Sequence, residues 1–102
     1  MQAQLNALVQ VIVADYNRTC ANDDMQRHFA DSITIKPGRK YIKIVAESSV
    51  WGFIVNTDSD SRFRRGDILK AASWAAPARN SARGNILDGG YTVRWTGPNY
   101  LV

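Results

Sequence analysis

The apolar periodicity of this chain changes once, near Ser32, and that change limits the folds open to it. Before this point, apolar side chains recur every three or four residues, the spacing of one face of an α-helix: Leu5, Leu8, Val9, Ile12, Val13 and Tyr16. After it, Ile33 and Ile35 alternate with polar neighbours, as in a half-buried strand. A helix followed by strands indicates an α+β fold.

Segments typical of strands follow Ser32 at residues 33–35, 40–45, 50–55, 68–71 and 91–95. A short hairpin connection lies between the segments 40–45 and 50–55. Gly52 in the second of these indicates a bulge or a close approach of another backbone. We expect one domain over residues 1–102, with a helical part (1–31) packed on one face of a largely antiparallel sheet (32–102). The sheet is expected to have about five strands, either open or curled into a small barrel.

Smaller signals complete the expected layout. Asn22 or Asp23 is expected to cap a second helical segment that contains Phe29. His28 in that segment is expected to be a surface histidine, since no cysteine or second histidine accompanies it. Residues 56–61 are polar and are expected to form an exposed, mobile loop, and residues 100–102 to pack back on the body.

Positive charge is concentrated in the second part of the chain. Residues 1–35 contain two arginines against four aspartates, a balance of −2. Residues 36–102 contain eleven Lys and Arg against five acidic residues, a balance of +6. This asymmetry favours a polyanionic partner such as nucleic acid, although many basic domains bind none.

The single cysteine and the first residues of the chain bear on the cellular compartment of the protein. Cys20 is the single cysteine, so no internal disulfide can form, and this favours an intracellular protein. The first residues lack the basic start and the cleavage site of a signal peptide. Polar residues interrupt the N-terminal apolar stretch, so we expect no membrane span. The prediction is a cytoplasmic protein.

No set of residues typical of catalysis or of metal binding can be assembled. Ser73 and Ser81 have only the remote His28 as a candidate base, and a triad needs three groups within hydrogen-bond reach. Residues 81–85 lack the glycine-rich pattern and the Lys-Ser/Thr pair of a phosphate-binding loop. We therefore expect a protein that is not an enzyme, with no metal and no small-molecule cofactor.

The long connection over residues 73–85 is the main candidate for a functional surface. A connection of this length is uncommon in a small domain and is usually functional or disordered, and its Trp and Pro argue for order. Arginine suits phosphate, asparagine suits an amide or a base edge, and tryptophan suits stacking on an unpaired base. The candidates are Trp74, Arg79, Asn80, Arg83 and Asn85. A structural role is the alternative: Trp74 in the core, and Arg79 and Arg83 bonded to loop carbonyls.

Two segments of this region are fairly specific: Lys-Ala-x-x-Trp-x-x-Pro-Ala from Lys70 and Arg-Gly-Asn from Arg83. With residues 38–45 and 53–55, they resemble a family of small proteins encoded by tailed bacteriophages, marine phages among them. The resemblance covers about residues 38–96 and leaves the N-terminal helix outside. It implies a phage setting, in the cytoplasm of an infected host cell, and no assigned activity. It adds Lys70 to the candidate contacts, and relatives that carry Lys where Arg79 stands argue against a strict need for a guanidinium there.

Two functions are consistent with these observations. The first is a phage accessory protein that binds nucleic acid through the basic sheet and loop. The alternative is a protein-interaction or assembly module, which binds a host factor or forms a homodimer through an exposed strand edge. Binding through phosphate contacts would weaken steeply with salt, whereas an apolar protein interface would not.

Overall fold

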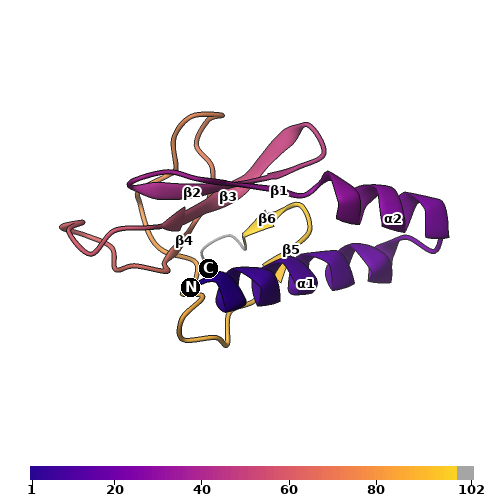
Figure 1. Cartoon of the computed structure of the whole chain (residues 1–102), viewed down its shortest axis with the longest axis horizontal. Coiled ribbons are helices and arrows are strands. Elements are labelled where there is room, and N and C mark those ends of the chain that lie inside the picture. The colour runs from indigo at the N-terminus through magenta and orange to yellow at the C-terminus, as the bar shows by residue number, and fades with distance from the viewer. Residues whose placement is uncertain (99–102) are drawn as a thin grey trace.

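A computed structural model of the chain describes residues 1–98 and has an α+β architecture (Figure 1). Two helices come first, followed by a four-stranded antiparallel sheet in the order β1-β2-β3-β4 and by a two-stranded ribbon of β5 and β6. The elements are α1 (Gln2–Thr19), α2 (Asp23–Ser32), β1 (Thr34–Pro37), β2 (Tyr41–Ala46), β3 (Ser49–Val55), β4 (Ile68–Leu69), β5 (Val93–Arg94) and β6 (Gly97–Pro98). Helices before strands is the order that the change in periodicity predicted. The expected packing of residues 100–102 lies outside the described residues.

The two helices bury most of the apolar positions that their repeat predicted. The buried residues of α1 are Leu5, Leu8, Ile12 and Tyr16. Val9 and Val13, also expected in the core, lie at the border of this stripe and are half-buried. Helix α2 begins after Asn22, whose side-chain oxygen accepts a hydrogen bond from the Met25 N–H at 2.9 Å, as the N-cap prediction required. Phe29 of α2 stacks on Tyr16 of α1 with ring centroids 4.1 Å apart.

Strands β3 and β4 of the main sheet are buried on both faces, whereas β1 at its edge is largely exposed. The face toward the helices carries Ile42, Ile44, Ile54 and Ile68. The opposite face carries Phe53, Val55 and Leu69, covered by Phe63. Because β3 has apolar neighbours on both sides, its sequence is a continuous apolar run. Each large side chain buried in this way contributes about 1.5–3 kcal/mol, so the two layers together hold the sheet in place.

Strand β3 contains a β-bulge at Trp51. Val50 and Gly52 pair with consecutive residues of β2, so Trp51 is an extra residue in the ladder. Its side chain joins the helix-facing core and is 3% exposed. Gly52 beside it allows a close approach, because a Cβ atom there would lie 2.9 Å from the carbonyl oxygen of Leu69. The bulge and the close approach that Gly52 indicated are therefore both present.

The sheet does not close into a barrel within residues 1–98, because β1 and β4 are not paired with each other. Residues 83–86 run along the outer edge of β4 instead. The segment 91–95, predicted as a strand of this sheet, has only Val93–Arg94 in a strand, and it pairs with β6. This ribbon lies between α1 and β3 (Figure 1), where the Trp51 indole N–H donates to the carbonyl of Arg94 at 2.8 Å. Helix and ribbon cover the face that a barrel would have to enclose.

Candidate functional site

Residues 70–85 form an ordered double turn on the side of the sheet away from α1 (Figure 1). The first part is a hairpin, closed by a hydrogen bond from the Ala78 N–H to the carbonyl of Lys70 at 2.7 Å. The second part returns along β4, where the Ile68 N–H donates to the carbonyl of Gly84 at 2.8 Å. Backbone hydrogen bonds thus supply the order that was predicted for this segment from its Trp and Pro.

Trp74 lies in the turn of this hairpin and is 53% exposed, so it is not the core anchor of the structural alternative. The ammonium nitrogens of Lys43 and Lys36 lie 4.7 and 5.9 Å from the centroid of its ring. These lysines are cross-strand partners on β2 and β1, so both reach the same indole. A cation over an exposed aromatic ring contributes about 0.5–1 kcal/mol. The outcome is an exposed aromatic surface held beside two positive charges.

Arg79 is bound by an acidic partner on the same side of the sheet. Its Nη1 and Nη2 atoms donate to the two carboxylate oxygens of Asp60 at 2.9 and 3.0 Å, and Nη1 also donates to the Tyr41 hydroxyl. The Asp60 side chain is 1% exposed and accepts further bonds from the N–H groups of Arg62 and Phe63. Arg79 first, and then these N–H groups, hold the pKa of Asp60 well below its usual range. This ion pair ties the loop of residues 56–61 to the long loop, and the exposure predicted for the segment is confirmed at Asp58, Ser59 and Ser61.

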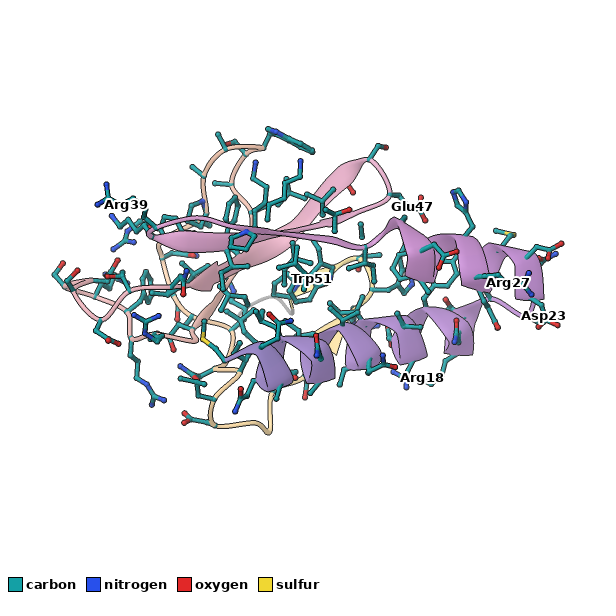
Figure 2. All side chains as sticks on the ribbon, in the orientation of Figure 1. Arg18, Asp23, Arg27, Arg39, Glu47 and Trp51 are labelled. Atoms are coloured by element: carbon teal, nitrogen blue, oxygen red, sulfur yellow. The ribbon has the colours of Figure 1, made fainter. Side chains whose placement is uncertain are left out.

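A polar cleft of about 510 Å³ opens beside this ion pair. Its lining residues are Arg39, Lys40, Thr57, Ser59, Asp60, Ser61 and Arg79. No ion pair within residues 1–98 involves Arg39 or Lys40, whereas the charge of Asp60 is matched by Arg79. Figure 2 shows Arg39 at the end of the molecule far from Asp23 of α2. The cleft therefore presents positive charge to an anion.

Three other predicted contact residues lie within the double turn of residues 70–85. Arg83 uses Nη1 to donate to the carbonyl of Ser81 at 2.9 Å and to the side chain of Asn80 at 3.2 Å, as the structural alternative proposed. Its Nε atom has no hydrogen-bond partner within residues 1–98. Asn80 is exposed, and its carbonyl accepts a bond from the guanidinium of Arg62. Lys70 is half-buried next to β4.

Asn85 has a structural position. It is 6% exposed, and its amide nitrogen donates to the carbonyl of Arg65 and to the Asp67 carboxylate, each at 2.9 Å. Its amide oxygen accepts the N–H of Leu87 at 2.8 Å. These bonds hold residues 83–86 against β4 and occupy both ends of the amide. We therefore leave Asn85 out of the candidate surface.

Sequence reasoning missed two residues of this region, Lys36 on β1 and Asp60 in the loop between β3 and β4. The lysine pair had a readable signal, because a hairpin closed at residues 38–41 places Lys36 opposite Lys43. Lys43 points away from the helices, since its ammonium lies over Trp74. The approach of Trp74 to these lysines had no local signal, since they lie on strands distant in the chain.

The chemistry available to this surface is the attraction of anions and stacking on flat rings. Residues 1–98 contain no group of three or more His, Cys, Asp or Glu placed to hold a metal ion. His28 is exposed on α2, as expected. In the described part of the chain, neither helix has the length and apolar character needed to cross a bilayer.

These features define a small α+β domain with a basic side that carries an exposed tryptophan. Residues 1–97 match the model of a family of unknown function, DUF7717, and the chain belongs to this family. No curated protein and no solved structure matches the chain. The family match includes both helices, whereas the resemblance seen in the sequence left the N-terminal helix outside. The helices are thus part of the family's domain.

Proposed function

We propose that the protein binds single-stranded nucleic acid, without catalysis, through a basic face that consists of Lys36, Arg39, Lys40, Lys43 and Trp74. The observation that carries this proposal is Trp74, an indole that is 53% exposed and lies beside two lysines. Stacking of an unpaired base on an aromatic side chain contributes about 1–3 kcal/mol. The ammonium groups beside the ring contact the phosphates on either side of the stacked base. These contacts release the counterions of the phosphates. The face therefore matches both repeating parts of a single strand, base and phosphate.

The distribution of ion pairs supports the choice of these cations. Arg64, Arg65 and Arg79 are paired with carboxylates, whereas no ion pair within residues 1–98 involves a residue of the basic face. We therefore assign the phosphate contacts to the lysines and Arg39, and give Arg79 and Arg83 the role of shaping the loop that presents Trp74. Lys70 and Asn80 lie beside the face as further contacts.

We further propose that the protein acts inside a phage-infected cell. The support is the resemblance of residues 38–96 to small proteins of tailed phages. Its most specific segment contains Trp74, which is exposed and contributes little to the core. A motif residue that is not needed for packing is better explained by a contact with a partner. This links the phage resemblance to the basic face.

The alternative, an assembly module, has one observation in its favour. Within residues 1–98 the outer edge of β1 is unpaired, and a groove of about 310 Å³ lies beside it. A second copy of the chain could pair there in a two-fold dimer. The same edge carries Lys36 and Pro37, and both residue types oppose strand pairing at an edge. We therefore place this function second.

Fluorescence anisotropy with short labelled single-stranded and double-stranded DNA and RNA tests the proposal. Trp74→Ala should weaken binding of the single strand by about 5- to 150-fold, which corresponds to the loss of one stacked base. Lys36→Ala combined with Lys43→Ala should lower the slope of log affinity against log salt by about 1.4, or 0.7 per phosphate contact. Arg94→Ala is the matched control, since Arg94 is exposed on the ribbon beside α1 and carries the same charge.

Two results would overturn the proposal. One is the absence of single-strand binding by the parent protein at about 50 mM salt, where phosphate contacts are strong. The other is a loss of affinity in Arg94→Ala as large as that in Lys43→Ala, with no loss in Trp74→Ala, which would indicate attraction by net charge alone. Circular dichroism of each variant shows that a lost affinity is not a lost fold.

A further inference from the structure

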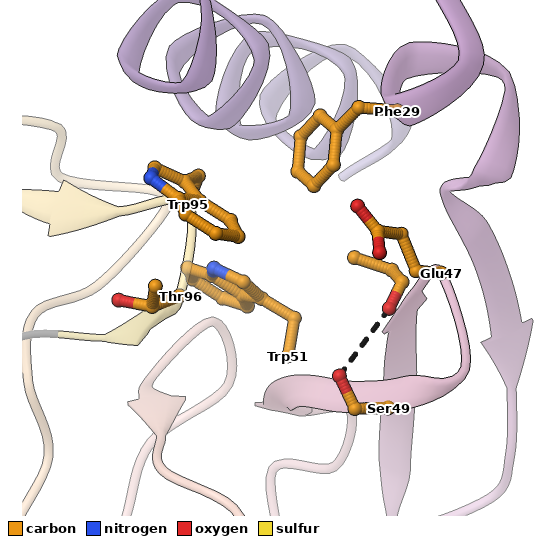
Figure 3. A pocket seen from close by; sticks show the side chains of 7 residues that line it. Phe29, Glu47, Ser49, Trp51, Trp95 and Thr96 are labelled. Atoms are coloured by element: carbon orange, nitrogen blue, oxygen red, sulfur yellow. Dashed lines mark hydrogen bonds between the residues drawn. The ribbon is translucent and has the colours of Figure 1, made fainter. Parts of the chain in front are cut away.

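A small aromatic pocket lies at the other end of the sheet from Arg39, where Figure 2 places Glu47. Its volume is about 160 Å³, and it opens between α2, the β2–β3 turn and the β5–β6 turn. Its lining residues are Phe29, Ala46, Glu47, Ser49, Trp51, Trp95 and Thr96. Figure 3 shows the indoles of Trp51 and Trp95 on one side and the Glu47 carboxylate facing them, with the ring of Phe29 above. We propose that this pocket binds a methylated ammonium group, with Glu47 as its counter-ion.

The aromatic walls are held in place before any ligand arrives. The Trp51 indole N–H donates to the carbonyl of Arg94 at 2.8 Å, so the ring cannot rotate without losing that bond. The backbone N–H of Trp95 donates to the carboxylate of Asp15 at 2.8 Å, which anchors the ribbon to α1. Trp95 also meets Phe29 edge to face, with centroids 5.8 Å apart and planes at 84°. A prearranged site loses little conformational entropy on binding.

Glu47 is placed in the pocket by an uncommon backbone. It is the first residue of the two-residue loop between Ala46 and Ser49, and its φ of 56° is a value at which glycine, asparagine or aspartate is usual. Its N–H donates to the Ser32 hydroxyl at 2.9 Å, which fixes the turn against the end of α2. A two-residue hairpin turn requires such a φ at its first position, so the turn fixes where the Glu47 side chain begins. No ion pair within residues 1–98 involves the Glu47 carboxylate.

The combination of rings and one carboxylate selects the class of ligand. An anion would be repelled by Glu47, and a metal ion would find a single carboxylate. A neutral apolar group would gain nothing from that carboxylate, which is exposed and stays hydrated beside it. A methylated ammonium has a diffuse charge that aromatic faces attract, and its methyl groups fill apolar space. A cavity of about 150 Å³ admits a guest the size of benzene, so the volume suffices.

Two sources supply such a group: a small molecule such as choline, or a methylated lysine of another protein. Titration with tetramethylammonium, choline and a trimethyl-lysine peptide, followed through the NMR signals of the indole N–H groups, tests both. We expect saturable shifts at Trp51 and Trp95 and none at Trp74, which lies on the basic face. The arm with the lower Kd, choline or peptide, identifies the source. Sodium chloride at equal ionic strength is the blank.

Two variants and one neutral ligand distinguish binding in this pocket from nonspecific attraction of a cation to the protein. Glu47→Gln keeps the size of the side chain and should weaken tetramethylammonium binding by about two- to fivefold, the upper part of the range for one exposed charge pair. Asp31→Asn removes the same charge from the exposed surface of nearby α2 and should leave the Kd unchanged. The neutral isostere of choline, 3,3-dimethylbutan-1-ol, should bind at least about tenfold more weakly than choline.

Each contrary result would overturn the inference. They are the absence of indole shifts with tetramethylammonium, equal binding of choline and its neutral isostere, and an unchanged Kd in Glu47→Gln. None of these depends on nucleic-acid binding, because the pocket and the basic face share no residue. The two proposals therefore fail or stand separately.

Discussion

Replacement of Asn85 by Ala should destabilise the fold strongly, because this side chain joins three parts of the chain. The variant removes two bonds donated by the amide nitrogen, to the Arg65 carbonyl and the Asp67 carboxylate, and one accepted by the amide oxygen from the Leu87 N–H. Asp67 is only 9% exposed, so water cannot fully replace the lost donor. The expected result concerns the free energy of unfolding and not ligand binding.

The magnitude follows from the groups left without partners. A buried polar group that loses its hydrogen bond costs about 1–3 kcal/mol, and groups near the surface lie at the low end because water can reach them. Counting Asp67 near the middle of this range and the two backbone groups low, we expect about 4 kcal/mol in total. At about 4–8 °C per kcal/mol for a domain of this size, the melting temperature should fall by at least about 16 °C.

Urea and thermal unfolding followed by circular dichroism measure this loss. Asn80→Ala is the matched control, since Asn80 lies in the same loop but is exposed, and it should lose less than about 1 kcal/mol. Asn85→Asp keeps the acceptor for Leu87 but sets a second carboxylate against Asp67, so its loss should be larger at neutral than at acid pH. Equal stability of Asn85→Ala and Asn80→Ala would refute the reasoning, and so would a selective loss of nucleic-acid affinity in a stable Asn85→Ala protein.

Three further outcomes can be checked. Leu8 is 0% exposed in α1, so Leu8→Ala should cost about 2–5 kcal/mol in urea unfolding, and equal losses in Leu8→Ala and the exposed Val11→Ala would contradict the core assignment. Because the folded state lowers the pKa of Asp60 from 3.8, its ion pair stabilises the fold above about pH 4 and is lost as the pH falls below that value. The free energy of unfolding of Asp60→Asn should therefore fall less with decreasing pH than that of the parent protein. Parallel curves of stability against pH for the two proteins would contradict this account. Light scattering at tens of micromolar should report a dimer if β1 pairs with a second copy, and a monomer would remove the assembly alternative.

Local signals account for the parts of the fold that could be predicted. The spacing from Leu5 to Tyr16 is a property of one helix, and it identified α1 without knowledge of what the helix packs against. The N-cap at Asn22 and the short connection between β2 and β3 act over a few residues, so they too could be read directly. The number of strands was less predictable, because short segments such as β4 take their strand character from their neighbours.

Contacts between distant residues decided the candidate site. Arg79 looked accessible in the sequence, yet it is paired with Asp60, a residue that the sequence placed in a mobile loop. The sequence left Trp74 open to the core or to the surface, and the structure places it on the surface, 53% exposed, with Lys43 over its ring. Each outcome depends on which strand lies beside which loop, and no local propensity contains that information.

The sequence by itself determined that a helical part precedes a sheet, where the central hairpin turns, and that the sheet and loop carry the positive charge. These follow from side-chain periodicity, turn chemistry and ionisation, all of which act within a few residues or need no coordinates. Only the tertiary structure decided that the sheet stays open and that the lysines and Trp74 form one surface. It also decided that the aromatic pocket forms around Glu47, since the pocket's walls come from α2, β3 and the ribbon. The physical reason is that packing and desolvation depend on distances between residues far apart in the chain, which are defined only once the fold has formed.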